Sequence, residues 1–496
     1  MPAFLAIDIG AESGRGVVIS YDGDRITLEE AHRFPNGPVH IRGHLYWDAL
    51  RIWSELKTAL MKAHRSRGEG LVSLGVDTWG VDFALLDKND ELVCNPRHYR
   101  DPRTEGMMEE AFKVVPKEEI YRRTGIQFMR LNTLYQLLAT LREGSTQLEV
   151  ARSLLMMPDL FNYWFCGKKV CEFTDATTTQ FFNPFENDWA RDLMDKLGIP
   201  THFLLEVVQP GTILGELDRA ISRELNIGHD IQVAATASHD TASAVAATPL
   251  GSEDDAYISS GTWSLVGMEV SKPFVNDETL RSNFTNEGGA FGTFRLLKNV
   301  QGLWLLEESR RAWSRLGRQY TYDQLIEMAR GAQPFKFVVD VDEGRFTVPT
   351  DMPATIADYC VQTGQGAPRD DAEVVRCIFD SLALKYRITI SNLESITGRR
   401  IREIHVVGGG SRNALLNQLV SDATGRRVVA GPAEATSVGN ALIQCAAMGF
   451  IRSSSQLREV VRRSFELQVF EPRREDAQAW DEFQDRFEVL RARVSP

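Results

Sequence analysis

The residues of this chain that could do chemistry gather in four short segments, and the first follows an apolar run that ends at Asp8. A glycine-containing turn with a hydroxyl and a guanidinium comes next, formed by Ala11, Glu12, Ser13, Gly14 and Arg15. Backbone N–H groups in such a turn can bind an anion, and an aspartate at a strand end can hold a metal ion, usually through water. The pattern predicts a phosphate-binding turn with Asp8 as a metal ligand. An ordinary hairpin with a surface arginine is the alternative.

Two further glycine turns lie in the second half of the sequence. The segment 259–264 (Ser-Ser-Gly-Thr-Trp-Ser) offers hydroxyl groups around Thr262, and the segment 408–413 (Gly-Gly-Gly-Ser-Arg-Asn) lets a flat ligand approach the backbone at Gly409. A helix C-cap or a simple turn is the alternative for the glycine triplet. The P-loop pattern and the Gly-x-Gly-x-x-Gly pattern do not occur, so neither a P-loop NTPase nor a Rossmann dehydrogenase is supported.

The fourth segment, residues 237–244, follows a predicted strand over 231–235. Its Asp240 is flanked by His239, Thr241 and small residues, so this carboxylate could face a cleft that admits a substrate. A carboxylate in that place can accept or orient the proton of a substrate hydroxyl during phosphoryl transfer. The alternatives are an N-cap role for Asp240 and a purely structural role for His239.

Length, composition and charge narrow the class of protein. The chain has 496 residues, of which 43% are hydrophobic and 25% charged, so it is expected to form two or three globular domains. With 56 Lys plus Arg against 68 Asp plus Glu, its net charge of −12 repels phosphate backbones and anionic lipids. We therefore expect no nucleic-acid or membrane partner. A monomer and a small homo-oligomer remain equally open.

The start of the sequence and its cysteines bear on location. No basic segment followed by an apolar run opens the sequence, and no apolar run approaches the roughly 20 residues that span a bilayer. Its six cysteines are widely spread, which favours reduced thiols in a cytoplasmic protein. Whether Cys360 and Cys377 pair is left open.

The predicted strands and helices that position the four segments form two similar α/β halves. Strands are predicted over 3–9, 15–21 and 27–33 as an antiparallel meander, followed by a helix over 47–65 and a strand over 72–76. The second half repeats this order with a hairpin over 256–268, a helix over 372–397, a strand over 404–407 and a helix over 413–424. Each half has the order of a ribonuclease-H-like unit. We place the domains at 1–248 and 249–496 and expect a central cleft between them.

The four segments together resemble the FGGY family of carbohydrate kinases over nearly the whole chain. Within that family the chain is most similar to members that act on L-rhamnulose. The segments that carry this resemblance are 75–83, 132–136, 157–159, 174–180, 237–246, 285–289 and 297–306. The match is specific because many motifs occur in one order.

The resemblance implies an actin-like ATPase fold and transfer of the ATP γ-phosphoryl group to the 1-hydroxyl of L-rhamnulose, with ADP as the other product. It implies Mg²⁺ as the cofactor that accompanies ATP. It places Ala11, Glu12, Ser13, Gly14, Arg15, Thr262 and Gly409 at ATP, and Gly80, His239, Asp240, Thr241 and Asn299 at the sugar, with Asp240 as the catalytic base.

Two glutamates depart from the family pattern. Glu307 stands where the family often has Gln, and it is left outside the site because a carboxylate near a triphosphate is unfavourable unless Mg²⁺ or an arginine intervenes. Glu12 is expected to point away from the phosphates or toward the metal. The alternative functions are a kinase for another sugar, such as L-fuculose or L-xylulose, and a non-catalytic actin-like ATP switch.

Overall fold

The computed structural model describes residues 1–493, which form two compact units. The first unit combines Met1–Pro249, Glu269–Leu296 and Ala435–Phe465. The second combines Leu250–Met268, Leu297–Glu434 and the described residues from Glu466 onward. The chain thus passes repeatedly from one unit to the other. The division at 248/249 concerns successive sequence domains and stays a prediction.

A six-stranded sheet of order β13-β14-β6-β1-β2-β3 forms the centre of the first unit. Strand β1 pairs antiparallel with β2 and β2 antiparallel with β3, which confirms the predicted meander. On its other side, β1 runs parallel to β6, and β6 runs parallel to β14. The bounds are β1 Ala3–Ile9, β2 Ser13–Tyr21, β3 Ile26–Pro35, β6 Leu71–Thr78, β13 Thr212–Glu216 and β14 Gln232–Ala235.

The turn between β1 and β2 is shorter than the sequence predicts. The N–H of Gly10 donates to the carbonyl of Ser13 at 2.9 Å, and β2 begins at Ser13, so Ser13 and Gly14 belong to the strand, whose start the sequence predicts at residue 15. A Cβ atom on Gly14 would lie 2.1 Å from the ring of Phe34 on β3. The missing side chain therefore lets strand pairing continue to the very end of the meander.

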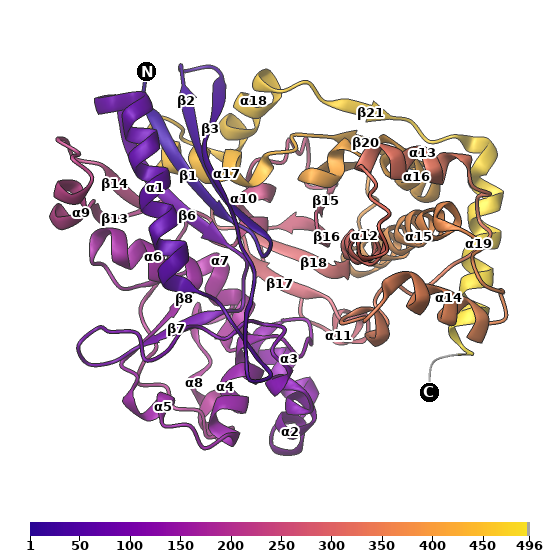
Figure 1. Ribbon diagram of the computed structural model, residues 1–496, viewed down its shortest axis with the longest axis horizontal. Helices are drawn as coiled ribbons and strands as arrows, with labels where there is room; N and C mark the ends of the chain where they lie inside the picture. Colours follow the sequence, from indigo (N-terminus) through magenta and orange to yellow (C-terminus); the bar gives the residue numbers. More distant parts are fainter. Residues whose placement is uncertain (494–496) are drawn as a thin grey trace. The chain divides into compact units, whose positions relative to one another are not determined.

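Helix α1, Ala49–Arg67, covers the meander (Figure 1). Asp48 caps it by accepting from the N–H of Arg51 at 3.1 Å, and its apolar stripe, including Leu56 and Leu60, is buried. The approach is close, because a Cβ atom on Gly16 would lie 2.7 Å from the Cβ of Ala59.

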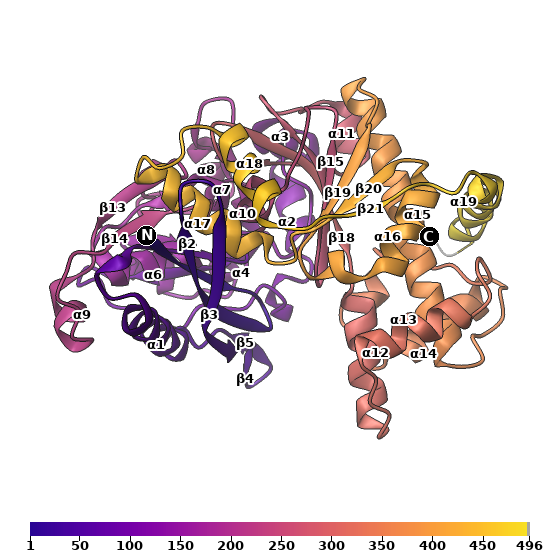
Figure 2. The same cartoon turned by 90° about the horizontal axis from the view of Figure 1, so that it is seen from above.

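Helices α10 (Asp240–Ala246) and α17 (Ala435–Ala447) lie side by side in the first unit (Figures 1 and 2). Their contact needs Gly439, since a Cβ there would lie 1.8 Å from the carbonyl oxygen of Ser243. The side chain of Gln444 on α17 donates to the carbonyl of Leu5 on β1 at 3.0 Å. This packing brings α17 to the strand ends that carry Asp8 and Asp77.

The remaining elements of the first unit surround the sheet or extend it. They are β4 Val39–Ile41, β5 His44–Tyr46, β7 Phe83–Leu86, α2 Met107–Val114, α3 Lys117–Thr124, α4 Thr133–Arg142, α5 Gln147–Val150, β8 Ser153–Met156, α6 Met157–Cys166, β9 Cys171–Glu172, α7 Phe173–Ala176, β10 Phe182–Asn183, β11 Asp188–Trp189, α8 Arg191–Lys196, β12 Val207–Val208, α9 Arg219–Glu224, α11 Asp277–Arg281, β17 Thr285–Gly288 and α18 Ser454–Ser464.

The second large sheet has seven strands in the order β17-β18-β16-β15-β19-β20-β21, and the six from β18 to β21 repeat the arrangement of the first sheet. Strand β15 is antiparallel to β16 and parallel to β19, β19 is parallel to β20, and β20 is antiparallel to β21. From β18 to β21 the order matches that of the first sheet read from β3 to β13, and β17 is an additional edge strand. The bounds are β15 Ala256–Ser260, β16 Trp263–Val270, β18 Phe294–Gln301, β19 Glu403–Val407, β20 Arg427–Ala430, β21 Gln468–Phe470, α12 Trp304–Arg315, α13 Tyr322–Gly331, α14 Met352–Gln362, α15 Asp371–Thr397, α16 Ala414–Thr424 and α19 Ala477–Arg491.

Within residues 1–493, no helix combines the length and apolar character needed to cross a membrane.

Candidate active site

Two aspartates stand at matched positions on neighbouring strands of the first unit. Asp8 on β1 is the parallel partner of Asp77 on β6. The carboxylate of Asp8 accepts from Nη2 of Arg15 at 2.7 Å and from the hydroxyl of Ser437 at 3.2 Å. Arg15, which the sequence predicts at the ATP phosphates, is therefore paired with the predicted metal ligand in this structure.

Asp77 is fully buried and only partly satisfied. Its Oδ2 accepts from the amide of Asn440 at 2.5 Å, while its Oδ1 has no hydrogen-bond partner among the described residues. Burial raises the pKa of Asp77 well above its usual value, and the charge of Asp8 acts in the same direction. A cation beside this pair of carboxylates would relieve both costs. The residues present thus fit a divalent ion, whose preferred ligands are oxygens.

Asp240 is the first residue of α10, and the N-cap is His239. Its Oδ1 accepts from the N–H of Thr241 at 2.5 Å and from the hydroxyl of Thr241 at 3.1 Å. Its Oδ2 has no hydrogen-bond partner in the part of the chain that the structure describes, and its side chain keeps 30% of its exposure. Loss of water raises the pKa of Asp240, while His239 lowers it. One oxygen is thus fixed and the other remains available to a ligand.

The backbone before Asp240 is anchored by two side chains from the segment 172–174. Oε2 of Glu172 accepts from the N–H of Ser238 at 3.1 Å, and it also accepts from the N–H and hydroxyl of Thr174. The hydroxyl oxygen of Thr174 in turn accepts from the N–H of His239 at 3.1 Å. Burial raises the pKa of Glu172 to about 7. Glu172 is not predicted from the sequence, because a glutamate among the buried residues around β9 matches no catalytic motif.

Gly80 lies on the loop after β6, beside the segment that carries His239. The N–H of Thr78 donates to the carbonyl of Ser238 at 2.9 Å, which joins the two segments. The loop is held by Asp82, whose Oδ2 accepts from the indoles of Trp47 at 2.6 Å and Trp79 at 3.0 Å. Burial raises the pKa of Asp82 to about 6. The first unit therefore carries Gly80, His239, Asp240 and Thr241 on two adjoining segments, and their contact with a sugar stays a prediction.

In the second unit, the glycine triplet packs against the β15–β16 turn. Added Cβ atoms would lie 2.9 Å from the carbonyl oxygen of Ser260 at Gly408 and 2.0 Å from its hydroxyl at Gly410. These two glycines are needed for packing, and Gly408 has a positive φ of 82°. Gly409 is different, because it is exposed and a Cβ there would meet nothing within 4 Å. The backbone at Gly409 is therefore open on one face, and its place at a nucleotide stays a prediction.

The start of α12 is hydrogen-bonded to the same β15–β16 turn. The N–H groups of Leu303 and Trp304 donate to the carbonyls of Gly261 and Thr262, both at 3.0 Å. The hydroxyl of Ser264 is turned inward to Tyr386 at 2.6 Å, so it is engaged within the protein. Thr262 is partly exposed on the turn itself.

Asn299 and Glu307 lie on either side of that junction. Asn299 is a partly exposed residue of β18. Glu307 on α12 accepts from Nη1 of Arg310 at 3.1 Å and from the hydroxyl of Tyr322. An arginine thus offsets the Glu307 charge, the condition under which a carboxylate near a triphosphate is tolerated.

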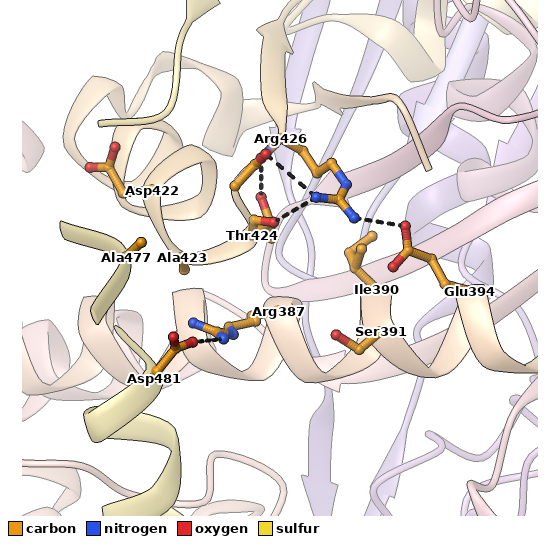
Figure 3. Close-up of a pocket in the computed structure, with 11 residues that line it drawn as sticks. Arg387, Ile390, Ser391, Glu394, Asp422, Ala423, Thr424, Arg426, Ala477 and Asp481 are labelled. Carbon is orange, nitrogen blue, oxygen red and sulfur yellow. Dashed lines mark hydrogen bonds and ion pairs between the residues drawn. The ribbon is translucent and has the colours of Figure 1, made fainter. Parts of the chain in front are cut away.

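Two other features of the second unit could hold small ligands. Asp255, Glu403 and His405 bring metal-type ligand atoms within 4.8 Å of one another, but Nε2 of His405 already lies 3.0 Å from Oε1 of Glu403. A pocket of about 180 Å³ is lined by residues of α15, α16 and α19. In it, Arg387 pairs with Asp481 and Arg426 with Glu394 (Figure 3). The predicted site residues do not line this pocket.

Family models match both halves of the chain. Residues 3–247 match the N-terminal domain, and residues 256–448 the C-terminal domain, of the FGGY family of carbohydrate kinases. A rhamnulokinase of Halalkalibacterium halodurans is 44% identical over 466 residues, which cover 94% of this chain and 98% of that protein. A rhamnulokinase of Bacteroides thetaiotaomicron is 42% identical over 479 residues, covering 96% and 97%.

Solved structures share the fold at low sequence identity. The ligand-bound xylulose kinase of Lactobacillus acidophilus has a TM-score of 0.81 at 16% identity and covers 99% of this chain and 98% of that one. The glycerol kinase of Plasmodium falciparum with ADP has a TM-score of 0.77 at 14% identity, covering 100% and 99%. The predicted two-domain actin-like fold is confirmed.

Proposed function

We propose, from the premise that the chain belongs to the FGGY family of carbohydrate kinases, that it transfers the γ-phosphoryl group of ATP to the 1-hydroxyl of L-rhamnulose. The products are L-rhamnulose 1-phosphate and ADP, in a step of L-rhamnose catabolism. Relatives named rhamnulokinase that align over nearly the full length support this choice of sugar. The observation that carries the mechanism is Asp240, with one carboxylate oxygen held and the other without a partner among the described residues.

Asp240 acts as the general base in this proposal. Its Oδ2 takes the proton of the sugar hydroxyl as that O–H bond breaks. The hydroxyl oxygen forms a bond to the γ-phosphorus, and the electron pair of the breaking P–O bond leaves with ADP. Phosphoryl transfer asks mainly for positioning and charge stabilisation, so a fixed carboxylate is sufficient machinery on the sugar side.

The other assignments divide between the two units. Gly80, His239, Thr241 and Asn299 contact the sugar, while residues 11–15, Thr262 and Gly409 contact ATP. We place the sugar and phosphate site in the sequence domain 1–248 and the nucleotide site in 249–496. The exposed face of Gly409 and the partly exposed Thr262 support the nucleotide side.

Asp8 is the residue that would hold Mg²⁺, next to the buried Asp77. When bound, the ion neutralises charge on the phosphates of ATP. Arg15 now pairs with Asp8, so we expect it to exchange part of that contact for phosphate oxygens when MgATP binds.

A panel of ketoses assayed with MgATP by coupled ADP release tests the proposal. We expect L-rhamnulose to give the highest kcat/KM, ahead of L-fuculose, L-xylulose and glycerol. Each buried polar group left unpaired by a wrong hydroxyl costs about 1–3 kcal/mol. A different best sugar would refute the specificity and leave the kinase assignment intact. Absence of ADP release with every sugar would favour a non-catalytic ATP switch.

A further inference from the structure

The His239 side chain lies between a buried ion pair and the proposed catalytic base. Its Nδ1 is 3.1 Å from Nη2 of Arg295 and 3.3 Å from Oε2 of Glu287. Its Nε2 is 3.5 Å from Oδ1 of Asp240. The two ring nitrogens therefore face opposite kinds of neighbour. Which nitrogen carries the proton decides what the ring can offer to Asp240.

Arg295 determines which ring nitrogen of His239 can carry the hydrogen. A guanidinium has five donors and no acceptor, and it stays protonated in proteins. Its Nη2 can hydrogen-bond to Nδ1 of His239 only if Nδ1 carries a lone pair and no hydrogen. The contact meets donor geometry at 3.1 Å. A neutral ring with a bare Nδ1 must carry its hydrogen on Nε2, the nitrogen on the side of Asp240.

Glu287 is the one neighbour that would favour the other tautomer. An ionised carboxylate only accepts, so alone it would draw a hydrogen onto Nδ1. Its Oε2, however, also lies 3.2 Å from Nη2 of Arg295, and the attraction of the guanidinium competes for it. Arg295 is fully buried, and its Nε donates to the carbonyl of Gly288 at 2.8 Å. Arg295 is therefore fixed in place between the carboxylate and the ring.

We propose that Arg295 is a positioning residue that holds His239 as the neutral tautomer with hydrogen on Nε2, so that the ring presents an N–H donor to Asp240 and the sugar site. The proposal rests on the proposed function, in which Asp240 is the base. With this tautomer, Oδ1 of Asp240 faces three donors: the N–H and hydroxyl of Thr241 and the N–H of His239. The proton from the sugar is then directed to Oδ2.

The backbone of His239 does not supply this control. Its N–H donates to the hydroxyl oxygen of Thr174, which fixes where the residue stands and leaves the protonation of the ring undetermined. The choice of tautomer comes from the groups that face the two ring nitrogens: Asp240 favours a hydrogen on Nε2, and Arg295 keeps Nδ1 without one. It therefore depends on Arg295, which lies on β18, well apart in sequence from the His239 segment.

Nitrogen NMR of the ligand-free enzyme tests the tautomer directly. Long-range proton–nitrogen spectra of enzyme with ¹⁵N-labelled histidine identify which ring nitrogen carries hydrogen, and His239→Gln assigns the signals. We expect a protonated Nε2 and a bare Nδ1 in the unmodified protein. A hydrogen on Nδ1, or a doubly protonated ring, overturns the proposal. This measurement needs no variant of Arg295 and no kinase activity, so it stands apart from any failure of the proposed function.

Variants of Arg295 test the consequence for catalysis. In Arg295→Met, Glu287 is the remaining polar neighbour of Nδ1, so we expect hydrogen to move to Nδ1 and kcat to fall about tenfold or more, while the sugar KM changes little. That loss stays short of the 10²–10⁴-fold expected when a general base is removed. Arg295→Lys keeps a donor without an acceptor and should restore the tautomer and part of the rate.

Arg458→Met is the control, because Arg458 also forms an ion pair with a glutamate of the same unit, Glu269, with side chains 13% and 16% exposed. We expect it to leave the tautomer and kcat unchanged, even where it lowers the thermal midpoint. If Arg295→Met retained the Nε2–H tautomer, or if Arg458→Met moved it equally, Arg295 would not be the residue that sets it.

Discussion

At the residue scale, the two oxygens of Asp240 are unlike. One is held by Thr241 and faces His239, and the other has no partner within residues 1–493. We therefore expect Asp240→Asn, which keeps size and hydrogen bonding but cannot take up the proton, to lose about 10²–10⁴-fold in kcat. Affinity for sugar and nucleotide should change little, as measured by calorimetric titration beside the rate.

An exposed aspartate provides the control for that variant. Asp195→Asn on α8 makes the same chemical change at the surface and should leave kcat unaffected. A rate for Asp240→Asn within about threefold of the unmodified enzyme would remove Asp240 from the role of base.

Asp8, the proposed metal ligand, can be tested separately from Asp240. Removing divalent metal with a chelator should abolish turnover, and Mg²⁺ or Mn²⁺ should restore it. Asp8→Ala should lower kcat far more than sugar affinity, because the proposed metal acts on ATP. It also leaves Arg15 without its partner at 2.7 Å, so Arg15→Gln is the companion variant. Normal turnover of Asp8→Ala with Mg²⁺ would contradict this place for the metal.

At the scale of secondary-structure elements, the junction of β9 and α7 positions the start of α10. Glu172→Ala removes the acceptor for the N–H of Ser238, so the backbone that carries Asp240 should shift. A displacement of about 1 Å can cost on the order of 10² in rate, and we expect a fall in kcat of that order. Glu172→Gln keeps an acceptor oxygen and should recover most of the activity.

Asp159, a buried aspartate next to Glu172, provides a control that distinguishes an effect on the position of Asp240 from an effect on the stability of the protein. Asp159 accepts from the N–H of Glu172 at 3.2 Å and, among the described residues, makes no hydrogen bond to the segment 238–240. Asp159→Asn should therefore lower the thermal midpoint and keep kcat. If Glu172→Ala behaved in the same way, its role would be structural only.

The pairing of β15 with β19 brings a histidine into a cluster of carboxylates. Burial by itself lowers the pKa of His405, but the hydrogen bonds and charges of Asp255 and Glu403 outweigh it, and the net pKa is raised. The folded state thus holds the proton more tightly than the unfolded state. Protonated His405 therefore stabilises the folded state fully when the pH is below about 6.5, the pKa of histidine in the unfolded chain. This stabilisation is lost as the pH rises through the higher pKa that His405 has in the folded protein.

We therefore expect the thermal midpoint of the unmodified protein to exceed that of His405→Gln by more at pH 6 than at pH 9. Melting curves across this range measure the difference. His40→Gln changes an exposed histidine and should give a difference independent of pH. A gap between wild type and His405→Gln that widened with rising pH would reverse the assigned sign.

At the scale of secondary-structure elements, the bounds predicted from the sequence can also be compared with the observed bounds. Apolar periodicity predicts β1 to within its observed bounds, and it places α15 and α16 to within a residue at each end. It does not predict that β2 begins at Ser13, because that depends on the ring of Phe34 filling the space above Gly14. Glu172 and Arg295 were missed for the same reason. Their roles come from contacts with residues distant in sequence, which no local pattern records.

At the scale of the whole molecule, the two sheets place the two proposed phosphate turns at equivalent points. The first turn joins β1 to β2, and the second joins β15 to β16, the matching pair of the second sheet. The first turn carries charged side chains and the second carries hydroxyls. Repetition of one supersecondary unit would thus supply two proposed anion sites, of which the second adds no charged side chain to a chain of net charge −12.

The path of the chain through the units makes a last prediction about unfolding. The chain crosses between units at 249/250, 268/269, 296/297, 434/435 and 465/466, and two of these crossings fall inside β16 and β18. Melting the first unit alone would break both strands and leave disordered insertions in the second. We therefore expect one cooperative calorimetric transition. In the proposed function L-rhamnulose binds mainly to residues of the first unit, and at 100 times its Kd it would stabilise the whole protein by about 2.7 kcal/mol and shift this single transition to higher temperature. Two resolved transitions, of which sugar shifts only one, would show that the units unfold independently despite the shared strands.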